Sequence, residues 1–197
     1  MQKISRNKFR ALYQPSKLLL GIIPIESSDE FNIIALCFTM TCSYKPPMIA
    51  VSIEKKNYSY ELMKVAPNFV LAVPGESLAK QAMACGLLSG RKVDKFSALN
   101  LTKQPLDNSG VPGIAEAIAN IELSVENRFI TGDHITIVGR VFGYHVNLKN
   151  IEKNLLAIGP NDKGYKLLAH KGLHRIAVVD GPNDVFLSGF KLDRILS

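Results

Sequence analysis

The sequence predicts a mostly β fold, an antiparallel barrel with short helical insertions. Six or more apolar runs rich in β-branched and aromatic residues alternate with turns of Gly, Pro, Asn and Asp. Two other segments place apolar residues at helical spacing. Residues 111–130 and 133–146 flank the turn TGD, a pattern typical of a long β-hairpin. We therefore expect one β-rich domain.

The first third of the chain favours an antiparallel meander over alternating strands and helices. Strands are predicted at 17–25, 31–41 and 48–54, separated by the turn ESSDE and by two consecutive prolines. Consecutive prolines cannot join a central strand ladder, so the segment CSYKPP should end the second strand.

Helices are expected at two places. Residues 57–67 show a helical face, with Asn57 as the N-cap and Pro67 as the stop. A strand at 68–74 follows, and then a second helix over 76–90. The second helix should turn Leu78, Ala82, Cys85 and Met83 inward. Beyond about residue 148 the pattern weakens, with short candidate strands at 165–170, 174–179 and 184–190.

Composition excludes several classes of protein. The 197 residues suit one domain, and 47% hydrophobic with 21% charged residues is an ordinary globular balance. The longest apolar run, 18–25, is too short to span a membrane. Residues 1–14 are basic but lack the apolar core of a secretion signal. Three cysteines without a CxxC pair favour a reducing cytoplasm over a disulfide framework.

The net charge of +7 suggests an anionic partner, but the cations are dispersed. This favours a small anionic ligand, or no specific ligand, over nucleic acid. No metal-ligand spacing is present, so no metal site is expected. The dinucleotide fingerprint, the Walker loop and the GxSxG elbow are also missing, which disfavours three large enzyme classes.

Three segments are candidates for ligand contact. In KKNYSY, residues 55–60, a lysine and a hydroxyl at a helix start could hold an anion, or the segment could simply cap the helix. In CGLLSGRKVDKF, residues 85–96, Arg91 and Lys95 follow glycines and could grip phosphate, or the segment could be an exposed turn. In CFTMTCSYKPP, residues 37–47, alternating hydroxyls could line a cleft or face solvent.

These segments, taken in order with TGDHITIVGRV, resemble the flavin reductase-like, FMN-binding split-barrel family and most of all its flavoredoxin branch. The resemblance covers about residues 15–148. It implies a single domain over 1–197 with its core at about 15–148 and a C-terminal extension at 149–197. The implied fold is a Greek-key-type split β-barrel, which forms a homodimer and holds FMN near the subunit interface.

The resemblance also implies the cofactor contacts. The flavin ring should lie against Phe38, Thr39, Met40 and Thr41, with Ser52 and Ile53 beside it. Two groups of residues should bind the phosphate. The first is Lys55, Tyr58, Ser59 and Tyr60, and the second is Ser89, Gly90, Arg91 and Lys95. This chain departs from the family pattern at Ala35, where Thr or Ser is frequent, and at Cys37 and Phe38, where Trp is frequent.

The implied activity is a flavin reductase-like oxidoreductase. NAD(P)H would reduce FMN, which would pass electrons to free flavin, ferric iron or a protein acceptor. The first alternative is an FMN electron carrier without turnover, and another is a dimer that has lost its cofactor. A more remote alternative is a basic barrel that binds single-stranded nucleic acid. His134 and His145 are candidate contacts for flavin or nicotinamide, or ordinary structural histidines.

Overall fold

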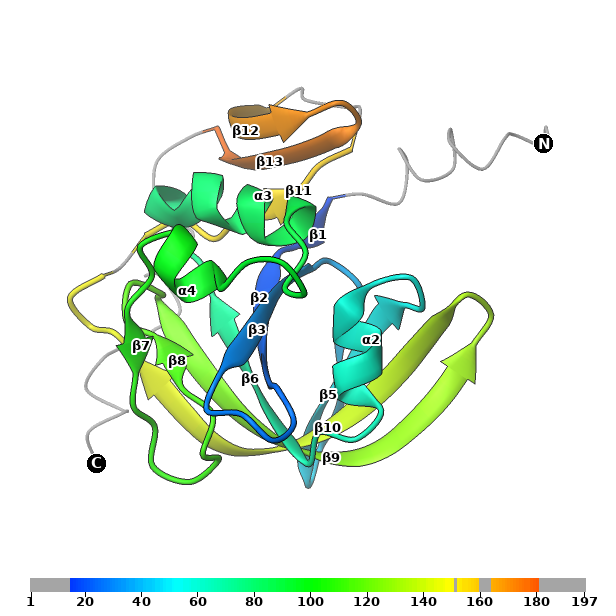
Figure 1. The fold of residues 1–197 in the computed structure, drawn as a ribbon. Helices are drawn as coiled ribbons and strands as arrows, with labels where there is room; N and C mark the ends of the chain where they lie inside the picture. Colours follow the sequence, from blue (N-terminus) through cyan, green and yellow to red (C-terminus); the bar gives the residue numbers. More distant parts are fainter. Residues whose placement is uncertain (1–14, 151, 160–163, 181–197) are drawn as a thin grey trace.

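The computed structural model describes residues 15–150, 152–159 and 164–180. Its main feature is a seven-stranded antiparallel sheet that curls into an open barrel (Figure 1). The mostly β fold with helical insertions is thereby confirmed. The strand order across the sheet is β3 (Phe31–Leu36), β2 (Leu19–Pro24), β6 (Asn68–Val73), β9 (Ala119–Thr131), β10 (His134–Val146), β5 (Pro47–Glu54) and β4 (Thr39–Tyr44).

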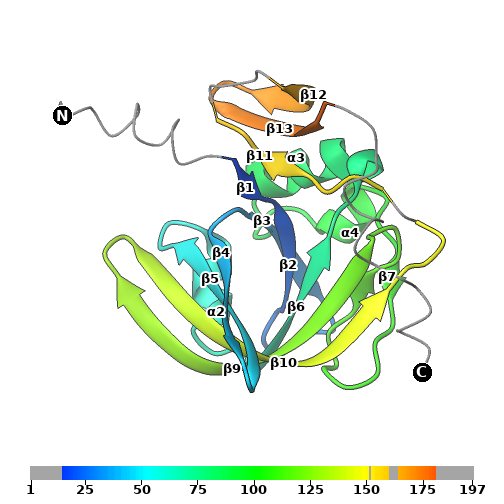
Figure 2. The same cartoon turned by 180° about the vertical axis from the view of Figure 1, so that it is seen from behind.

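A smaller sheet lies on the outer side of helix α3 (Figures 1 and 2). It brings the start of the described chain together with its end, in the order β1 (Ser16–Lys17), β11 (Leu156–Ala157), β13 (His174–Val179) and β12 (Tyr165–Lys171). A third, two-stranded ribbon pairs β7 (Lys103–Gln104) with β8 (Gly113–Ile114).

In the part of the chain that the structure describes, four helical segments interrupt the strands: α2 (Tyr58–Met63), the 3-10 turn η1 (Glu76–Leu78), α3 (Ala79–Leu87) and α4 (Lys95–Ala98). The first three correspond to the two expected helices, whereas α4 was not predicted. Asp94 is the N-cap of α4, and its carboxylate accepts hydrogen bonds from Phe96 N at 3.0 Å and Ser97 Oγ at 2.6 Å. No described helix is long and apolar enough to cross a membrane.

The central strands β2 and β6 are buried on both faces, which explains their continuous apolar sequences. One face, with Leu20 and Ile22, packs against α3, α4 and the smaller sheet. The other face, with Leu19 and Ile23, packs inside the barrel beneath α2. The inward positions predicted for the second helix are confirmed: Leu78, Ala82 and Cys85 are buried, and Met83 is partly buried.

Two strand predictions were wrong in detail. The single strand expected at 31–41 is broken at Cys37 and Phe38, because β3 and β4 form opposite edges of the sheet and the chain must cross between them. The strand expected at 111–130 becomes β9 only at Ala119, after the short β8 and a turn. The TGD hairpin is confirmed, with Gly132 at a positive φ of 61°. The candidate strand 184–190 and the basic segment 1–14 lie outside the described residues.

Candidate functional site

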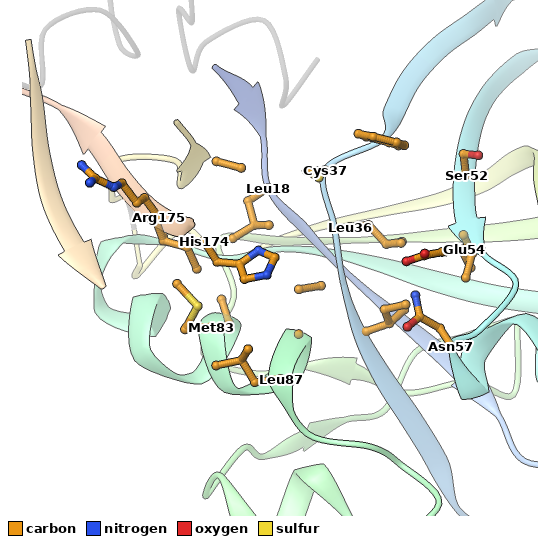
Figure 3. Close-up of a pocket in the computed structure, with 18 of the residues that line it drawn as sticks. Leu18, Leu36, Cys37, Ser52, Glu54, Asn57, Met83, Leu87, His174 and Arg175 are labelled. Carbon is orange, nitrogen blue, oxygen red and sulfur yellow. The ribbon is translucent and has the colours of Figure 1, made fainter. Parts of the chain in front are cut away.

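A cavity of about 550 Å³ opens between the barrel, α3 and the smaller sheet (Figure 3). This volume is in the range of ordinary small-molecule sites. Its walls come from β3 and the link to β4 (34–38), from β5 (52–54), from Lys56 and Asn57 before α2, and from α3. Strand β13 and the turn before it supply another wall, and Leu18, His134, Ala157 and Gly159 complete the lining. The α3 wall and part of the barrel wall are apolar, with Leu18, Leu36, Cys37, Ala82, Met83 and Leu87.

An aromatic pair lies at the barrel side of the cavity. The rings of Phe38 and His134 stack, with centroids 5.5 Å apart and planes inclined by 26°. The backbone holds Phe38 in place, because its carbonyl accepts a hydrogen bond from Ser52 N at 2.9 Å. His134 Nδ1 lies 2.6 Å from Asp133 Oδ1, which fixes the orientation of the imidazole ring. Phe38, Ser52 and His134 all line the cavity.

Hydrogen bonds brace the hairpin tip that carries His134. Lys55 Nζ donates to the Gly132 carbonyl at 2.7 Å, and Lys55 N donates to the Asp133 carbonyl at 2.9 Å. The Lys55 ammonium thus holds the β9–β10 turn against the end of β5. Beside it, Lys56 pairs with Glu54 at 2.8 Å, and both residues line the cavity.

The two segments expected to bind phosphate lie together in the fold. Arg91 Cζ lies 4.5 Å from the centroid of the Tyr58 ring. Gly90 packs so closely on Asn32 and Tyr58 that a Cβ at Gly90 would overlap the Asn32 side chain. Asn32 in turn donates to Ser59 Oγ at 2.7 Å. Loop 88–94 is therefore seated on the start of α2. We call the group Asn32, Tyr58, Ser59, Gly90 and Arg91 the loop–helix junction.

The junction is connected to the cavity on both sides. Asn57, which precedes Tyr58, lines the cavity, and so do Gly86 and Leu87 at the end of α3, just before the loop. Arg91 is exposed, so its guanidinium can meet a ligand, whereas the Ser59 hydroxyl is buried. Ser89 is exposed, and its Oγ accepts a long hydrogen bond from Arg91 N at 3.4 Å.

Lys95 differs most from the expectation. Its side chain is only 3% exposed, and its ammonium donates to the carbonyls of Ile33 at 2.5 Å and Cys85 at 2.8 Å. Burial lowers the pKa of Lys95 below its ordinary value. In this position the ammonium ties α4 to β3 and to α3, and neither of its two acceptors belongs to the loop–helix junction.

The nearby thiol is equally enclosed. Burial raises the pKa of the Cys85 thiol to about 12, although the Lys95 ammonium acts in the opposite direction. Such a thiol stays protonated at neutral pH, so Cys85 is a core residue and not a nucleophile.

The remaining expected contacts are spread around the site. Ile53 lines the cavity from β5. Thr39, Met40 and Thr41 lie on β4, the strand at the sheet edge, and they are not among the lining residues. Met40 and Thr41 are exposed, whereas Tyr60 is half-buried against the barrel core.

His145 lies apart from the cavity lining and pairs with Glu122. Its Nε2 is 2.7 Å from Glu122 Oε2, and Glu122 is fully buried. The other carboxylate oxygen accepts from Asn108 N at 3.2 Å and Ser109 N at 2.7 Å. Burial alone would raise the pKa of Glu122, but these hydrogen bonds outweigh it and lower the pKa to about 2. This pair holds the loop 105–111 to the sheet.

Sequence reasoning missed the wall formed at the C-terminal end of the described chain. Four residues of the β12–β13 hairpin line the cavity: Leu173, His174, Arg175 and Ile176. Figure 3 shows the His174 imidazole pointing into the cavity opposite Asn57. The pairing of β13 with β11 places the hairpin at the cavity, and this long-range pairing has no local pattern in the sequence. The basic residues in 165–179 were the available sequence signal.

Comparison with known proteins identifies the family. The model of the flavin reductase-like domain matches residues 21–166. The chain belongs to the flavin reductase-like family. A protein of Archaeoglobus fulgidus is 33% identical over 146 residues, covering 74% of this chain and 79% of the relative. The chain spans about half of some longer members, such as the high molecular weight rubredoxin of Moorella thermoacetica, of which 53% is covered at 31% identity.

Solved structures of flavin reductase-like proteins share the fold. The FMN-binding protein of Thermus thermophilus with bound 1-cyclohex-2-enone superposes with a TM-score of 0.67 at 26% identity, covering 81% of this chain and 90% of that one. Flavoredoxin of Methanosarcina acetivorans gives 0.71 at 22% identity, with 98% of both chains covered. A split-barrel flavin reductase-type protein of Shewanella frigidimarina gives 0.70 at 13% identity, covering 82% and 87%. The predicted split-barrel fold and family are thus confirmed.

Proposed function

We propose that this flavin reductase-like protein binds FMN and passes electrons from NAD(P)H through it to an acceptor. The observation that supports this most is the loop–helix junction. Two segments that each resemble a phosphate site in the sequence meet there. The exposed Arg91 stacks on Tyr58, which directly follows Asn57, a residue of the cavity wall. FMN, when bound, supplies the redox chemistry, and the protein supplies position and electrostatics.

The residues present fit FMN in three respects. Apolar side chains of α3 and the β3–β4 link offer a surface for a flat ring, and Phe38 stands at its edge. The Ser52 hydroxyl and backbone groups of β5 can meet the polar side of the ring. Arg91 can form charge-assisted hydrogen bonds to phosphate, and the bare backbone of Gly90 lets the loop approach α2 closely. Lys95 is not part of this proposal, because its ammonium is already bound to two carbonyls.

His134 is the candidate contact for the reacting region. It lines the cavity, and both its stacking on Phe38 and its hydrogen bond to Asp133 hold the imidazole in one orientation. We propose that it orients the ring of flavin or nicotinamide. His145 is excluded from this role in our proposal, because its ring nitrogen is bound to buried Glu122.

We also propose a homodimer. Large apolar side chains are exposed on the outer parts of β4, β9 and β10: Met40, Tyr44, Phe129, Ile130, Tyr144 and Val146. Exposed apolar patches of this kind often mark interaction surfaces. A second copy would cover β4 and the hairpin end with Phe129 and Ile130, near Phe38 and His134, whereas Tyr144 and Val146 lie at the opposite end of β10. Sedimentation at micromolar protein with FMN bound should give about twice the mass of 21.7 kDa. A monomer under those conditions would contradict the proposal.

Mixing FMN-loaded protein with NADH or NADPH without oxygen tests the reductase activity. The reductase proposal predicts that the visible absorption of the oxidised flavin is lost at a rate that saturates with one of the two dinucleotides. Slow, non-saturating loss with both, together with rapid reduction by a small chemical reductant, would support an electron carrier instead. Failure to bind FMN at all would contradict both.

A further inference from the structure

The β12–β13 hairpin forms a wall of the cavity that family membership does not explain. The family model ends at residue 166, within β12, so the tip of the hairpin and all of β13 lie beyond the matched region. Yet Leu173, His174, Arg175 and Ile176 line the cavity from this segment. The ligand that this wall could bind therefore depends on the residues of the hairpin itself.

Strand register assigns the hairpin residues to two faces. His174 pairs with Lys171, and His170 pairs with Arg175. Directly opposed residues of antiparallel strands share a face, and neighbours along a strand alternate. The register places Lys171 directly opposite His174, whose imidazole points into the cavity (Figure 3), although Lys171 itself is not among the lining residues. His170 lies opposite Arg175, one position further from the tip, and is not among the lining residues.

The hairpin is basic throughout. Residues 165–179 contain Lys166, His170, Lys171, His174 and Arg175 but no Asp or Glu. At the base, the Lys166 ammonium is bound to Glu76 at 2.6 Å. At the tip, Lys171 is exposed and makes no ion pair with the part of the chain that the structure describes. The positive charge at the tip thus stays available to an anion.

We propose that Lys171 and His174 bind the phosphate groups of the nicotinamide dinucleotide donor while its ring enters the cavity. This inference rests on the proposed function. A dinucleotide has its own phosphates and needs a cationic site apart from the one that holds the FMN phosphate. His174 lies across the cavity from Asn57, beside which the loop–helix junction begins (Figure 3). Leu173, 85% exposed at the tip, offers an apolar surface to a base.

The test uses full-length, FMN-loaded protein and the variants Lys171→Ala and His174→Ala. Anaerobic reduction at increasing NADH or NADPH gives a dissociation constant for the donor and a limiting rate. Each variant should weaken donor binding by about threefold to tenfold, as expected for losing one hydrogen bond or charge contact, and leave the limiting rate within about twofold. Lys171→Ala should also lower the salt dependence of donor binding.

Two control variants match the changes. His170→Ala removes the same side chain from a neighbouring position that does not line the cavity, and Lys166→Ala removes the same charge from the same hairpin where Glu76 already neutralises it. Both should bind the donor like wild type. Equal weakening in the controls would overturn the proposal, because a general loss of charge would then explain the effect.

Other outcomes separate this proposal from the function on which it rests. Unchanged donor binding in both test variants, with FMN still bound, would overturn the hairpin site and leave the flavin function standing. A loss of FMN affinity without a loss of riboflavin affinity would assign the hairpin to the cofactor phosphate and also overturn it. If wild type binds FMN but neither dinucleotide reduces it or perturbs its spectrum, the hairpin proposal fails and the electron-carrier alternative gains. If wild type does not bind FMN, both proposals fail.

Discussion

The guanidinium of Arg91 lies over the ring of Tyr58, with Cζ 4.5 Å from the ring centroid. A cation above an aromatic face is attracted to the ring while its N–H groups stay available at the edge of the guanidinium plane. Tyr58 directly follows Asn57, which lines the cavity, and Arg91 follows α3, whose residues also line it, so the contact joins two segments next to the cavity wall. The stacking positions Arg91 before any ligand arrives, which lowers the ordering cost of binding an anion.

Arg91→Ala should weaken FMN binding and leave riboflavin binding nearly unchanged, because only FMN carries phosphate. Loss of a charge-assisted hydrogen bond typically costs about 1.5–3 kcal/mol. Arg91→Lys should recover only part of this, since a lysine keeps the charge but loses the planar fork. Fluorescence titration with both flavins measures the effects. Lys92→Ala, at the exposed neighbouring position, is the control, and equal effects at the two positions would contradict a specific role for Arg91.

Lys95→Met should lower the free energy of unfolding, not the preference for FMN over riboflavin. The variant leaves the carbonyls of Ile33 and Cys85 without the ammonium donor. Each buried group that loses its hydrogen bond typically lowers stability by about 1–3 kcal/mol. Denaturant unfolding of the variant and of Lys92→Met measures this difference. Unchanged stability together with a selective loss of FMN affinity would instead return Lys95 to the phosphate site that the sequence suggested.

Glu122 should make stability sensitive to acid. Its folded pKa of about 2 lies below the ordinary value of 4.5, so its contribution is fully present above pH 4.5 and is lost as the pH falls towards 2. Glu122→Gln should be less stable than wild type at pH 7. Its stability should also change less than that of wild type between about pH 5 and pH 2.5, where the carboxyl of Glu122 loses its contribution. Urea unfolding across this range measures both effects.

Glu126→Gln is the matched control for Glu122, because Glu126 pairs with Arg140 at the surface, where ion pairs contribute little. Its unfolding should follow the wild-type pH dependence. If Glu122→Gln loses stability between pH 5 and 2.5 as steeply as wild type, another group governs the acid response.

Much of the fold could be predicted because its signals are local. The long hairpin around Gly132 and the inward face of α3 follow from turn chemistry and periodicity. The break at Cys37 and Phe38 could not, since apolar and β-branched residues continue through it and the break follows from the order of strands in the sheet. The assignment of Arg91 and Ser59 to one phosphate site rests on the chemistry of their side chains and on the family resemblance, and no local pattern in the sequence predicts that they lie close together.

The site residues that escaped prediction depend on long-range contacts. The sequence around Lys95 predicts a cation in a loop. However, one of the two carbonyls that accept hydrogen bonds from its ammonium belongs to Ile33, which lies 62 residues away in the sequence. His174 reaches the cavity because β13 pairs with β11 and carries the hairpin over α3. No periodicity or motif in 165–179 records that pairing. Such contacts form only when distant parts of the chain share a core.

Paired titrations of the purified protein with FMN and riboflavin test the central claim most directly. Flavin fluorescence at low and high salt gives both dissociation constants under the same conditions. The account predicts that FMN binds at least about tenfold more tightly, as one charge-assisted contact would produce, and that raising the salt concentration narrows the difference. Equal dissociation constants, or no binding of either flavin, would contradict it.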